Sequence, residues 1–231
     1  MTKILVISDI HANLTALETV LADAGKVDEV WCLGDIAGYG PDPNECIERL
    51  CALPKLTCMM GNHDYAAITG DVSGFNSRAA IAALWTSKQL TEENRHFLAG
   101  LPREMKVDLP GARLYITHGS PDDNLWEYLF PATHSDIFGY YLKKLSVDVI
   151  GVGHSHVPFT WQAPEGTVFN PGSVGQPRDG DPRACYAVLS LAGGEVAVRH
   201  HRVGYDIETS ARKVIDAGLP DTLARRLFSG E

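Results

Sequence analysis

The sequence predicts an α/β protein, because short apolar runs typical of buried strands alternate with stretches of helical spacing. The runs at 3–7, 30–33 and 56–60 are each followed by such a stretch. A second observation concerns where the runs end: five of them, far apart in the chain, finish in Asp, Asn or His. Because α/β proteins carry their sites at strand ends, this pattern also predicts where the site lies.

On an extended backbone, residues i and i+2 point to the same side, so an Asp-x-His or His-x-His pair aims two side chains into one cavity. One such pair is weak evidence, whereas the same feature at five strand ends is strong. In chain order the candidates are Asp9 and His11 after 3–7, Asp35 after 30–33, Asn62, His63 and Asp64 after 56–60, His118 after 114–117, and His154 and His156 after 147–152.

The first helix is predicted from Leu14 to Ala24, where apolar residues recur at helical spacing. Asn13 stands directly before it, at the position where Asn satisfies unpaired backbone donors as an N-cap. A contact from Asn13 to a substrate phosphate is the alternative interpretation. A Gly/Pro-rich loop at 36–43 then precedes a second helix at 44–52.

Residues 65–101 are predicted to be helical, with an Ala-rich part at 79–84 and a further helix opened by Thr91. An aromatic insertion follows Ser120, and a helix is expected at 135–145. The aromatic residues either wall the site or pack internally. With no linker in sight, residues 1–231 are predicted to form a single domain, in which 65–101 and 120–146 are a possible cap. Later strands are expected at 167–170, 185–191 and 196–203, with a turn at 170–173 and helices from about 207.

The composition, 45% hydrophobic and 21% charged, is that of a globular protein, with no apolar stretch long enough to span a membrane. No signal peptide precedes the first strand, so a cytoplasmic protein is expected. The five cysteines are unclustered and predicted to be buried free thiols of a reducing compartment. They are Cys32, Cys46, Cys51, Cys58 and Cys185.

The net charge of −9 argues against a protein that grips extended nucleic acid by its phosphates. Bound metal ions would change the local charge. Two divalent ions beside the carboxylates of Asp9 and Asp35 leave a pocket of about +2, which attracts a small phosphoester.

The candidate donors are oxygens and imidazoles without a thiolate, a set that suits Mn, Fe, Zn, Co or Ni and disfavours a Cys-based structural zinc site. Seven donors are too many for one such ion. Two divalent transition-metal ions that share one carboxylate fit better.

The ordered set Asp9-x-His11, Gly34-Asp35, Gly61-Asn62-His63-Asp64, His118 and Gly153-His154-x-His156 resembles the motifs of the calcineurin-like metallophosphoesterases. The turn at 170–173 further resembles the small bacterial and archaeal branch, of phosphodiesterase type. This resemblance implies a four-layer αββα fold, in which helices flank a sandwich of two mixed sheets. It implies that Asp9, His11 and His156 bind one metal, that Asn62, His118 and His154 bind the other, and that Asp35 bridges both.

The resemblance also implies the reaction, in which a hydroxide held between the two metals attacks phosphorus in line. His63 is then free to protonate the leaving oxygen as general acid. A charged His63 beside a cationic cluster needs a nearby anion, for which Asp64 and Asp42 are the candidates. Arg178 is a candidate phosphate contact, and a solvated loop arginine is the alternative.

The expected function is hydrolysis of a phosphodiester or small nucleotide phosphoester. The phosphoprotein phosphatases of the family carry a second Asp and an Arg where this chain has Gly38 and Tyr39, which argues against that substrate. A phosphomonoesterase and a dinucleoside polyphosphate hydrolase remain alternatives. A non-catalytic scaffold of the same fold is a further one, although such proteins usually lack a ligand or the catalytic His. A homo-oligomer is possible.

Overall fold

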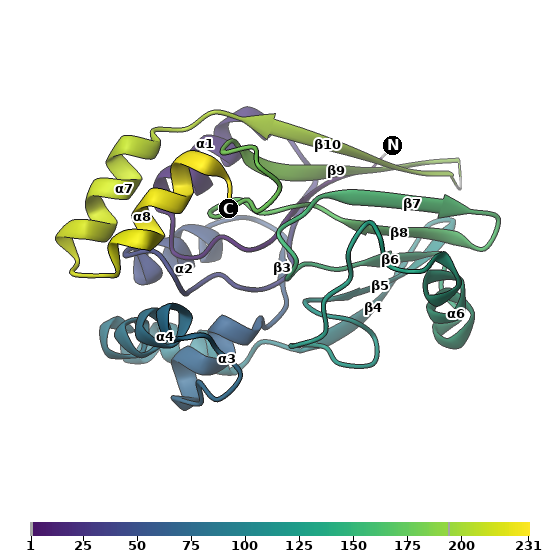
Figure 1. Ribbon diagram of the computed structural model, residues 1–231. Helices are drawn as coiled ribbons and strands as arrows, with labels where there is room; N and C mark the ends of the chain where they lie inside the picture. The colour runs from purple at the N-terminus through teal and green to yellow at the C-terminus, as the bar shows by residue number, and fades with distance from the viewer. Residues whose placement is uncertain (1, 194) are drawn as a thin grey trace.

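The computed structural model describes residues 2–193 and 195–231. Two five-stranded mixed sheets face each other, in the strand orders β10-β9-β1-β2-β3 and β4-β5-β6-β8-β7. Helices cover the outer faces of both sheets (Figure 1). The predicted fold class, a two-sheet mixed sandwich flanked by helices, is confirmed.

Three parallel strands of the first sheet end at the same edge. β1 (Thr2–Ile7) pairs with β2 (Glu29–Cys32), which pairs with β3 (Leu56–Cys58). The register sets Ile7 opposite Cys32 and Cys32 opposite Cys58, so the chain leaves all three strands side by side. β9 (Ala184–Ala192) and β10 (Glu195–Val203) complete the sheet by antiparallel pairing.

The second sheet also has a parallel centre, formed by β5 (Ala112–Thr117), β6 (Val149–Gly151) and β8 (Gly166–Asn170). Its two edge strands, β4 (Glu104–Leu109) and β7 (Phe159–Ala163), pair antiparallel to their neighbours. The sequence analysis did not predict these two strands.

Apolar side chains fill the space between the sheets. Trp31 and Leu33 lie on the inner face of the first sheet and pack with Ile116 and Phe169 from the second sheet. All four are almost fully buried, and burying side chains of this size contributes about 1.5–3 kcal/mol each. This layer fixes the two sheets against each other and therefore fixes the relative positions of their strand ends.

Helices α1 (Leu14–Ala24), α2 (Pro43–Cys51) and α5 (Glu92–Ala99) pack on the outer face of the first sheet, and α6 (Ser135–Leu145) packs on the second. In Figure 1, α6 stands apart from the other labelled helices. α4 (Ser77–Gln89), α7 (Ile207–Asp216) and α8 (Asp221–Ser229) share a cluster with Tyr39. α2 begins one residue before its predicted start, with Pro43 in its first turn, where a missing N–H is tolerated.

The first helix of the 65–101 region starts earlier than predicted. α3 (Asn62–Thr69) already contains Asn62, His63 and Asp64, which lie before the predicted start at residue 65. The Asp64 carboxylate accepts the Gly61 N–H at 3.0 Å and so caps this helix start. Gly70, whose φ is +75°, is the C-cap of α3, and the chain is not helical again until Ser77.

The cysteine prediction is partly wrong. Four of the five thiols are buried, but Cys51 is exposed because it lies at the solvent-facing end of α2. No helix in the described part of the chain is both long and apolar enough to cross a membrane.

Candidate metal centre

The two ligand pairs do not lie on extended backbone, so the basis of the i, i+2 prediction is wrong. β1 and β6 end at Ile7 and Gly151, before the pairs begin. The φ angles are 53° at Asp9, 49° at His11, 64° at His154 and 58° at His156, all in the left-handed region. With these turns, Asp9 and His11 lie in one group of possible metal ligands, and His154 and His156 lie in two groups that share Asp35.

Backbone hydrogen bonds hold these turns in place. The N–H groups of Asp9 and His11 donate to the carbonyls of Gly34 and Asp35, both at 3.0 Å. Two side chains of the turn at 170–173 also bind these turns. The side-chain amide of Asn170 donates to the Gly153 carbonyl at 2.6 Å, and the Ser173 hydroxyl donates to the Asp9 carbonyl at 2.8 Å. The turn at 170–173 therefore ties the two ligand-bearing turns together.

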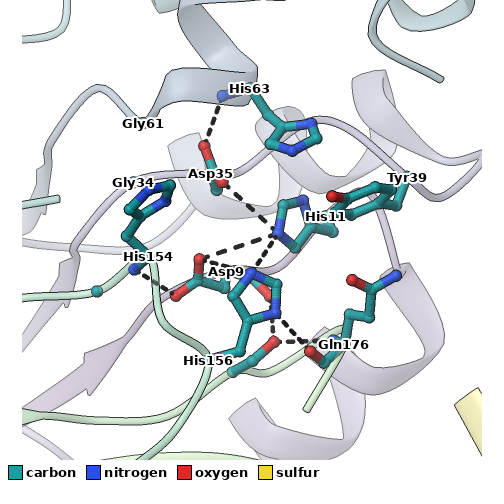
Figure 2. Close-up of polar contacts among 12 residues, drawn as sticks. Asp9, His11, Gly34, Asp35, Tyr39, Gly61, His63, His154, His156 and Gln176 are labelled. Atoms are coloured by element: carbon teal, nitrogen blue, oxygen red, sulfur yellow. Dashed lines mark hydrogen bonds and ion pairs between the residues drawn. The ribbon is translucent and has the colours of Figure 1, made fainter. Parts of the chain in front are cut away.

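The first donor group consists of Asp9, His11, Asp35 and His156, all buried. Figure 2 shows the side chains of Asp9, His11 and His156 pointing toward one another. His156 Nε2 lies 3.1 Å from His11 Nε2 and 3.2 Å from Asp9 Oδ1, and His11 Nε2 lies 3.6 Å from Asp35 Oδ2.

The second donor group consists of Asp35, His118 and His154. His118 Nε2 lies 3.4 Å from Asp35 Oδ2 and 3.1 Å from Asn62 Oδ1, which adds Asn62 to this group. Asp35 belongs to both groups, and the same oxygen, Oδ2, faces both. Its other oxygen, Oδ1, accepts the backbone N–H of His63 at the start of α3, at 2.8 Å.

The donor set fits divalent cations. Two ligands that each lie ~2.1 Å from one ion are about 3.0–3.4 Å apart at tetrahedral or octahedral angles, close to the spacings seen here. Asp9 Oδ1 and Asp35 Oδ2 are buried and have no hydrogen-bond partner within the described residues. A buried carboxylate oxygen without a partner is costly, and a bound cation removes that cost.

In three of the imidazoles, one ring nitrogen lies at hydrogen-bond distance from a backbone carbonyl oxygen. His118 Nδ1 faces Leu33 O at 2.8 Å, His156 Nδ1 faces Gln176 O, and His154 Nε2 faces Trp126 O at 3.2 Å. A carbonyl can only accept, so each of these nitrogens is assigned the proton. The other nitrogen of each ring is then the atom that would bind a metal ion, and in His118 it would lose its proton to do so.

Burial keeps most of these imidazoles neutral, as metal ligation requires. It lowers the pKa of His11 and His156 well below the usual range and lowers the pKa of His154 to about 3. Asp35 and His118 behave as a pair. Although burial opposes both charges, their mutual attraction lowers the pKa of Asp35 and raises that of His118 to about 9.

His63 is enclosed by rings beside the first group. Its ring centroid lies 4.4 Å from that of Tyr39, 4.5 Å from Phe75 and 4.8 Å from His11. A Cβ added at Gly38 would lie 2.5 Å from His63 Nδ1, so Gly38 leaves the space that this ring fills. Burial lowers the pKa of His63 to about 4.

Neither predicted carboxylate contacts the His63 ring. Asp64 accepts the backbone N–H groups of Ile36, Ala37 and Gly61, so its carboxylate anchors the loop after Asp35. Asp42 is paired with Lys213 at 2.8 Å. Both carboxylates are engaged elsewhere, and His63 Nδ1 has no partner within the described residues.

A cavity of about 390 Å³ opens onto the donor groups. Both predicted cap segments line it, through residues at 74–76 and through Trp126 and Tyr128. Arg178 lines it as well, so this residue is not a solvated loop arginine. Arg226 from α8 also reaches the cavity, a contact that the sequence analysis did not predict.

Asn13 is engaged as an N-cap. Its Oδ1 accepts the Ala16 N–H at 3.1 Å and the Ser210 hydroxyl at 2.9 Å, and its Nδ2 donates to the Gly175 carbonyl at 3.1 Å. Asn13 is not among the residues that line the 390 Å³ cavity.

Comparison with known proteins gives a family match and several close relatives. The model of the calcineurin-like phosphoesterase superfamily domain matches residues 2–194. The protein MJ0912 of Methanocaldococcus jannaschii is 40% identical, over 99% of this chain and 98% of its own length. The phosphodiesterase YfcE of Escherichia coli K12 is 30% identical, over 82% of this chain and 88% of its own length.

A crystal structure of a metallophosphoesterase from Sphaerobacter thermophilus has the same fold. Its TM-score is 0.86 at 39% identity, with 100% of this chain and 99% of that chain covered. The family match ends before α7 and α8. The Sphaerobacter structure and MJ0912 match this chain over almost its whole length, including these two helices. The family match, the relatives and the buried Asp/His groups agree, and the chain belongs to the calcineurin-like phosphoesterase superfamily as a metal-dependent phosphoester hydrolase.

Proposed function

We propose that this protein is a phosphodiesterase with two divalent metal ions, acting on a small phosphodiester or nucleotide phosphoester. The observation that carries this proposal is the position of Asp35 Oδ2. This oxygen is buried and unpaired, and it lies 3.6 Å from His11 Nε2 in one donor group and 3.4 Å from His118 Nε2 in the other. One carboxylate oxygen shared by two donor groups is the arrangement that a pair of ions needs.

The ligands divide between the two ions by proximity. Asp9, His11 and His156 would hold one ion, and Asn62, His118 and His154 would hold the other, with Asp35 shared. When bound, such ions activate water at neutral pH and neutralise the charge of the phosphoryl oxygens. Carboxylate, amide and imidazole ligands suit ions of Mn, Fe, Zn, Co or Ni.

His63 is proposed as the general acid that protonates the leaving oxygen. Because burial lowers its pKa to about 4, this role requires that the negative charge of the bound phosphoester raises that pKa. It lines the cavity, and no donor in either metal group depends on its ring. Its ring is held by Tyr39 and Phe75 and by the space at Gly38, so its position is fixed before substrate arrives. Asp64 acts on this site indirectly, because it anchors the Asp35 loop and the start of α3.

The segments 65–101 and 120–146 are proposed to form a cap over the metal centre. Phe75 from the first segment and Trp126 from the second meet edge to face, with ring centroids 5.3 Å apart. Apolar rings at this position exclude water and offer a surface for an aromatic leaving group or base.

The test is hydrolysis of bis-p-nitrophenyl phosphate with added Mn²⁺ by the wild type, Asp35→Asn and His63→Ala, with metal content measured on each protein. Asp35→Asn is expected to lose both metal and activity. His63→Ala is expected to keep its metal and lose about 10²–10⁴ in rate, most strongly on an ester with an alkoxide leaving group, which needs protonation more than nitrophenolate does. Wild-type activity that survives both substitutions would refute the proposal.

A further inference from the structure

Two arginines flank one tyrosine at the wall of the active-site cavity. The guanidinium carbon of Arg178 lies 5.6 Å from the centroid of the Tyr39 ring, and that of Arg226 lies 5.8 Å from it. Arg178 belongs to the loop that follows β8, and Arg226 belongs to α8. Both residues line the same 390 Å³ cavity as Asp35 and His63.

Neither guanidinium has an acidic side chain as partner within the described residues. Arg178 Nη2 donates to the Tyr39 hydroxyl and to Gln176 Oε1, both at 3.1 Å, and its Nε is buried without a partner. Arg226 Nε donates to the backbone oxygen of Glu231. Arg178 therefore keeps charge and N–H donors that no carboxylate neutralises, and the η nitrogens of Arg226 donate to no carboxylate within the described residues.

Positive charge is concentrated here although the chain carries a net charge of −9. Burial and the neighbouring Arg178 lower the pKa of Arg226, and Arg78 on α4 adds repulsion from a third side. Like charges held together in a half-buried wall are unfavourable, and an anion bound between them removes the repulsion.

The arginine pair lies next to the metal centre without belonging to it. The Tyr39 ring centroid is 4.6 Å from that of His11 and 4.4 Å from that of His63, so one aromatic ring separates the two regions. Arg226 is supplied by α8, which lies beyond the family match at residues 2–194. Arg178 lies within the family match, so the arginine pair joins one residue of the family core to one residue from outside it.

We propose that Arg178 and Arg226 form a second anion-binding subsite, which holds a phosphoryl group adjacent to the one that is cleaved. The substrate class is then a phosphoester with at least two phosphoryl groups. Paired guanidiniums with free donors suit the planar, bidentate recognition of phosphate oxygens. This inference rests on the proposed function for the cleaved bond, and it adds a preference for substrates with a second phosphoryl group.

The test compares the binding of inorganic pyrophosphate and inorganic phosphate by isothermal titration calorimetry, at a fixed free Mn²⁺ concentration. The wild type is expected to prefer pyrophosphate. In Arg226→Gln, the Kd for pyrophosphate should rise about tenfold or more relative to the Kd for phosphate, because charged hydrogen bonds to the second group are lost. The matched control is Arg225→Gln, whose exposed side chain pairs with Asp221 on the outside of α8 and which should bind like wild type.

An equal loss for both anions in Arg226→Gln, or no loss for either, would overturn the proposal. If Arg226→Gln does not fold, Arg178→Lys decides instead, since it keeps the charge but loses the planar fork, and the same selective loss is expected. Hydrolysis of bis-p-nitrophenyl phosphate, which has one phosphoryl group, is measured in parallel on the wild type. Its absence would refute the proposed function, while the calorimetric comparison would still decide on the subsite.

Discussion

Five of the proposed metal ligands have backbone conformations that L-amino acids rarely adopt. Asp9, His11, Asp35, His154 and His156 all have φ between 49° and 64°. The left-handed conformation costs roughly 1–2 kcal/mol per residue, and it persists only where surrounding contacts enforce it. Bound cations between these side chains would offset that cost, which ties the strain to the function of the site.

Gly38 shows how one missing Cβ positions His63. Gly38→Ala would place a methyl group 2.5 Å from His63 Nδ1, on a residue with φ of +107°, and so would push the imidazole away. We expect kcat on bis-p-nitrophenyl phosphate to fall about 10–100-fold with metal content unchanged, since a shift of about 1 Å in a catalytic group is enough for that.

The control for Gly38→Ala is Gly70→Ala. Gly70 also has a positive φ, +75°, but a Cβ there meets nothing within 4 Å. This variant carries the backbone strain alone, about 1 kcal/mol, and should keep the wild-type rate. Equal kcat values for the two variants would show that Gly38 does not position the imidazole.

The sequence alone pointed to the residues of the candidate metal centre, but it did not point to the side chains around them. Asp9, Asp35 and His118 stand out because each follows an apolar run within two residues, a local signal that one sequence carries. Tyr39 and Arg226 carry no such signal. They are 187 residues apart by their numbering, and only the packing of α8 brings them together.

At the scale of elements, Asn13 connects two helices. It caps α1 through Ala16 and accepts the Ser210 hydroxyl of α7 at 2.9 Å. Asn13→Ala removes a cap, worth about 1 kcal/mol, and leaves buried polar partners unpaired, at about 1–3 kcal/mol more. Urea denaturation should therefore show a loss of about 2–4 kcal/mol.

Thr91→Ala provides the comparison for Asn13→Ala. Thr91 caps α5 through a single bond to the Asn94 N–H, at 3.2 Å, and is exposed. Its replacement should cost only about 1 kcal/mol. The substrate contact considered for Asn13 would appear differently, as a rise in KM in Asn13→Ala protein that is still folded.

The loop that carries Trp126 has two separate contacts with the site. The Trp126 side chain packs on Phe75 and Gly74, while the Trp126 backbone carbonyl accepts a hydrogen bond from His154 Nε2 at 3.2 Å. Trp126→Ala removes the first contact and keeps the second. We expect KM for bis-p-nitrophenyl phosphate to rise about 2–10-fold, from the loss of an aromatic contact, with metal content unchanged.

Phe130→Ala is the matched change for Trp126→Ala, because it removes an aromatic ring from the same loop. Phe130 is exposed, stacks on Tyr128 with centroids 5.6 Å apart, and does not line the cavity. The KM of Phe130→Ala for bis-p-nitrophenyl phosphate should stay at the wild-type value. A KM that rises as much in Phe130→Ala would indicate that the loop as a whole has moved.

The two strands that the sequence analysis missed are both edges of the second sheet, whereas the edge strands β3 and β10 of the first sheet were predicted. The runs at 3–7 and 30–33 are central, so both faces are buried and the sequence is continuously apolar. β4 and β7 are the edges of the second sheet, and residues of β4 alternate between exposed and partly buried. Their polar positions weaken the apolar signal, and the sequence analysis missed both strands.

At the scale of the whole molecule, the sandwich brings donors from two sheets to one place. Asp9, Asp35 and Asn62 follow strands of the first sheet, whereas His118, His154 and His156 follow strands of the second. The hydrophobic pattern alone gives no pairing between sheets, so this convergence rested on the family resemblance. The buried layer between the sheets fixes it in the structure.

Because the ligands come from both sheets, metal binding should stabilise the whole fold. A ligand at 100 times its Kd adds about 2.7 kcal/mol to the stability of the state that binds it. For a chain of this length, each kcal/mol raises the Tm by roughly 2–4 °C. Saturating Mn²⁺ is therefore expected to raise the Tm of the EDTA-treated protein by about 5–10 °C, measured by differential scanning calorimetry.

This stabilisation should depend on the shared carboxylate and not on charge in general. Asp35→Asn removes the one oxygen that both donor groups face, and it should abolish most of the Mn²⁺-dependent rise in Tm. Asp108→Asn makes the same chemical change on an exposed face of β4, so its Tm should rise with Mn²⁺ as in the wild type. If Asp35→Asn kept the full rise, the ions would bind outside the two donor groups, because a site built on Asp35 cannot lose that carboxylate without losing affinity.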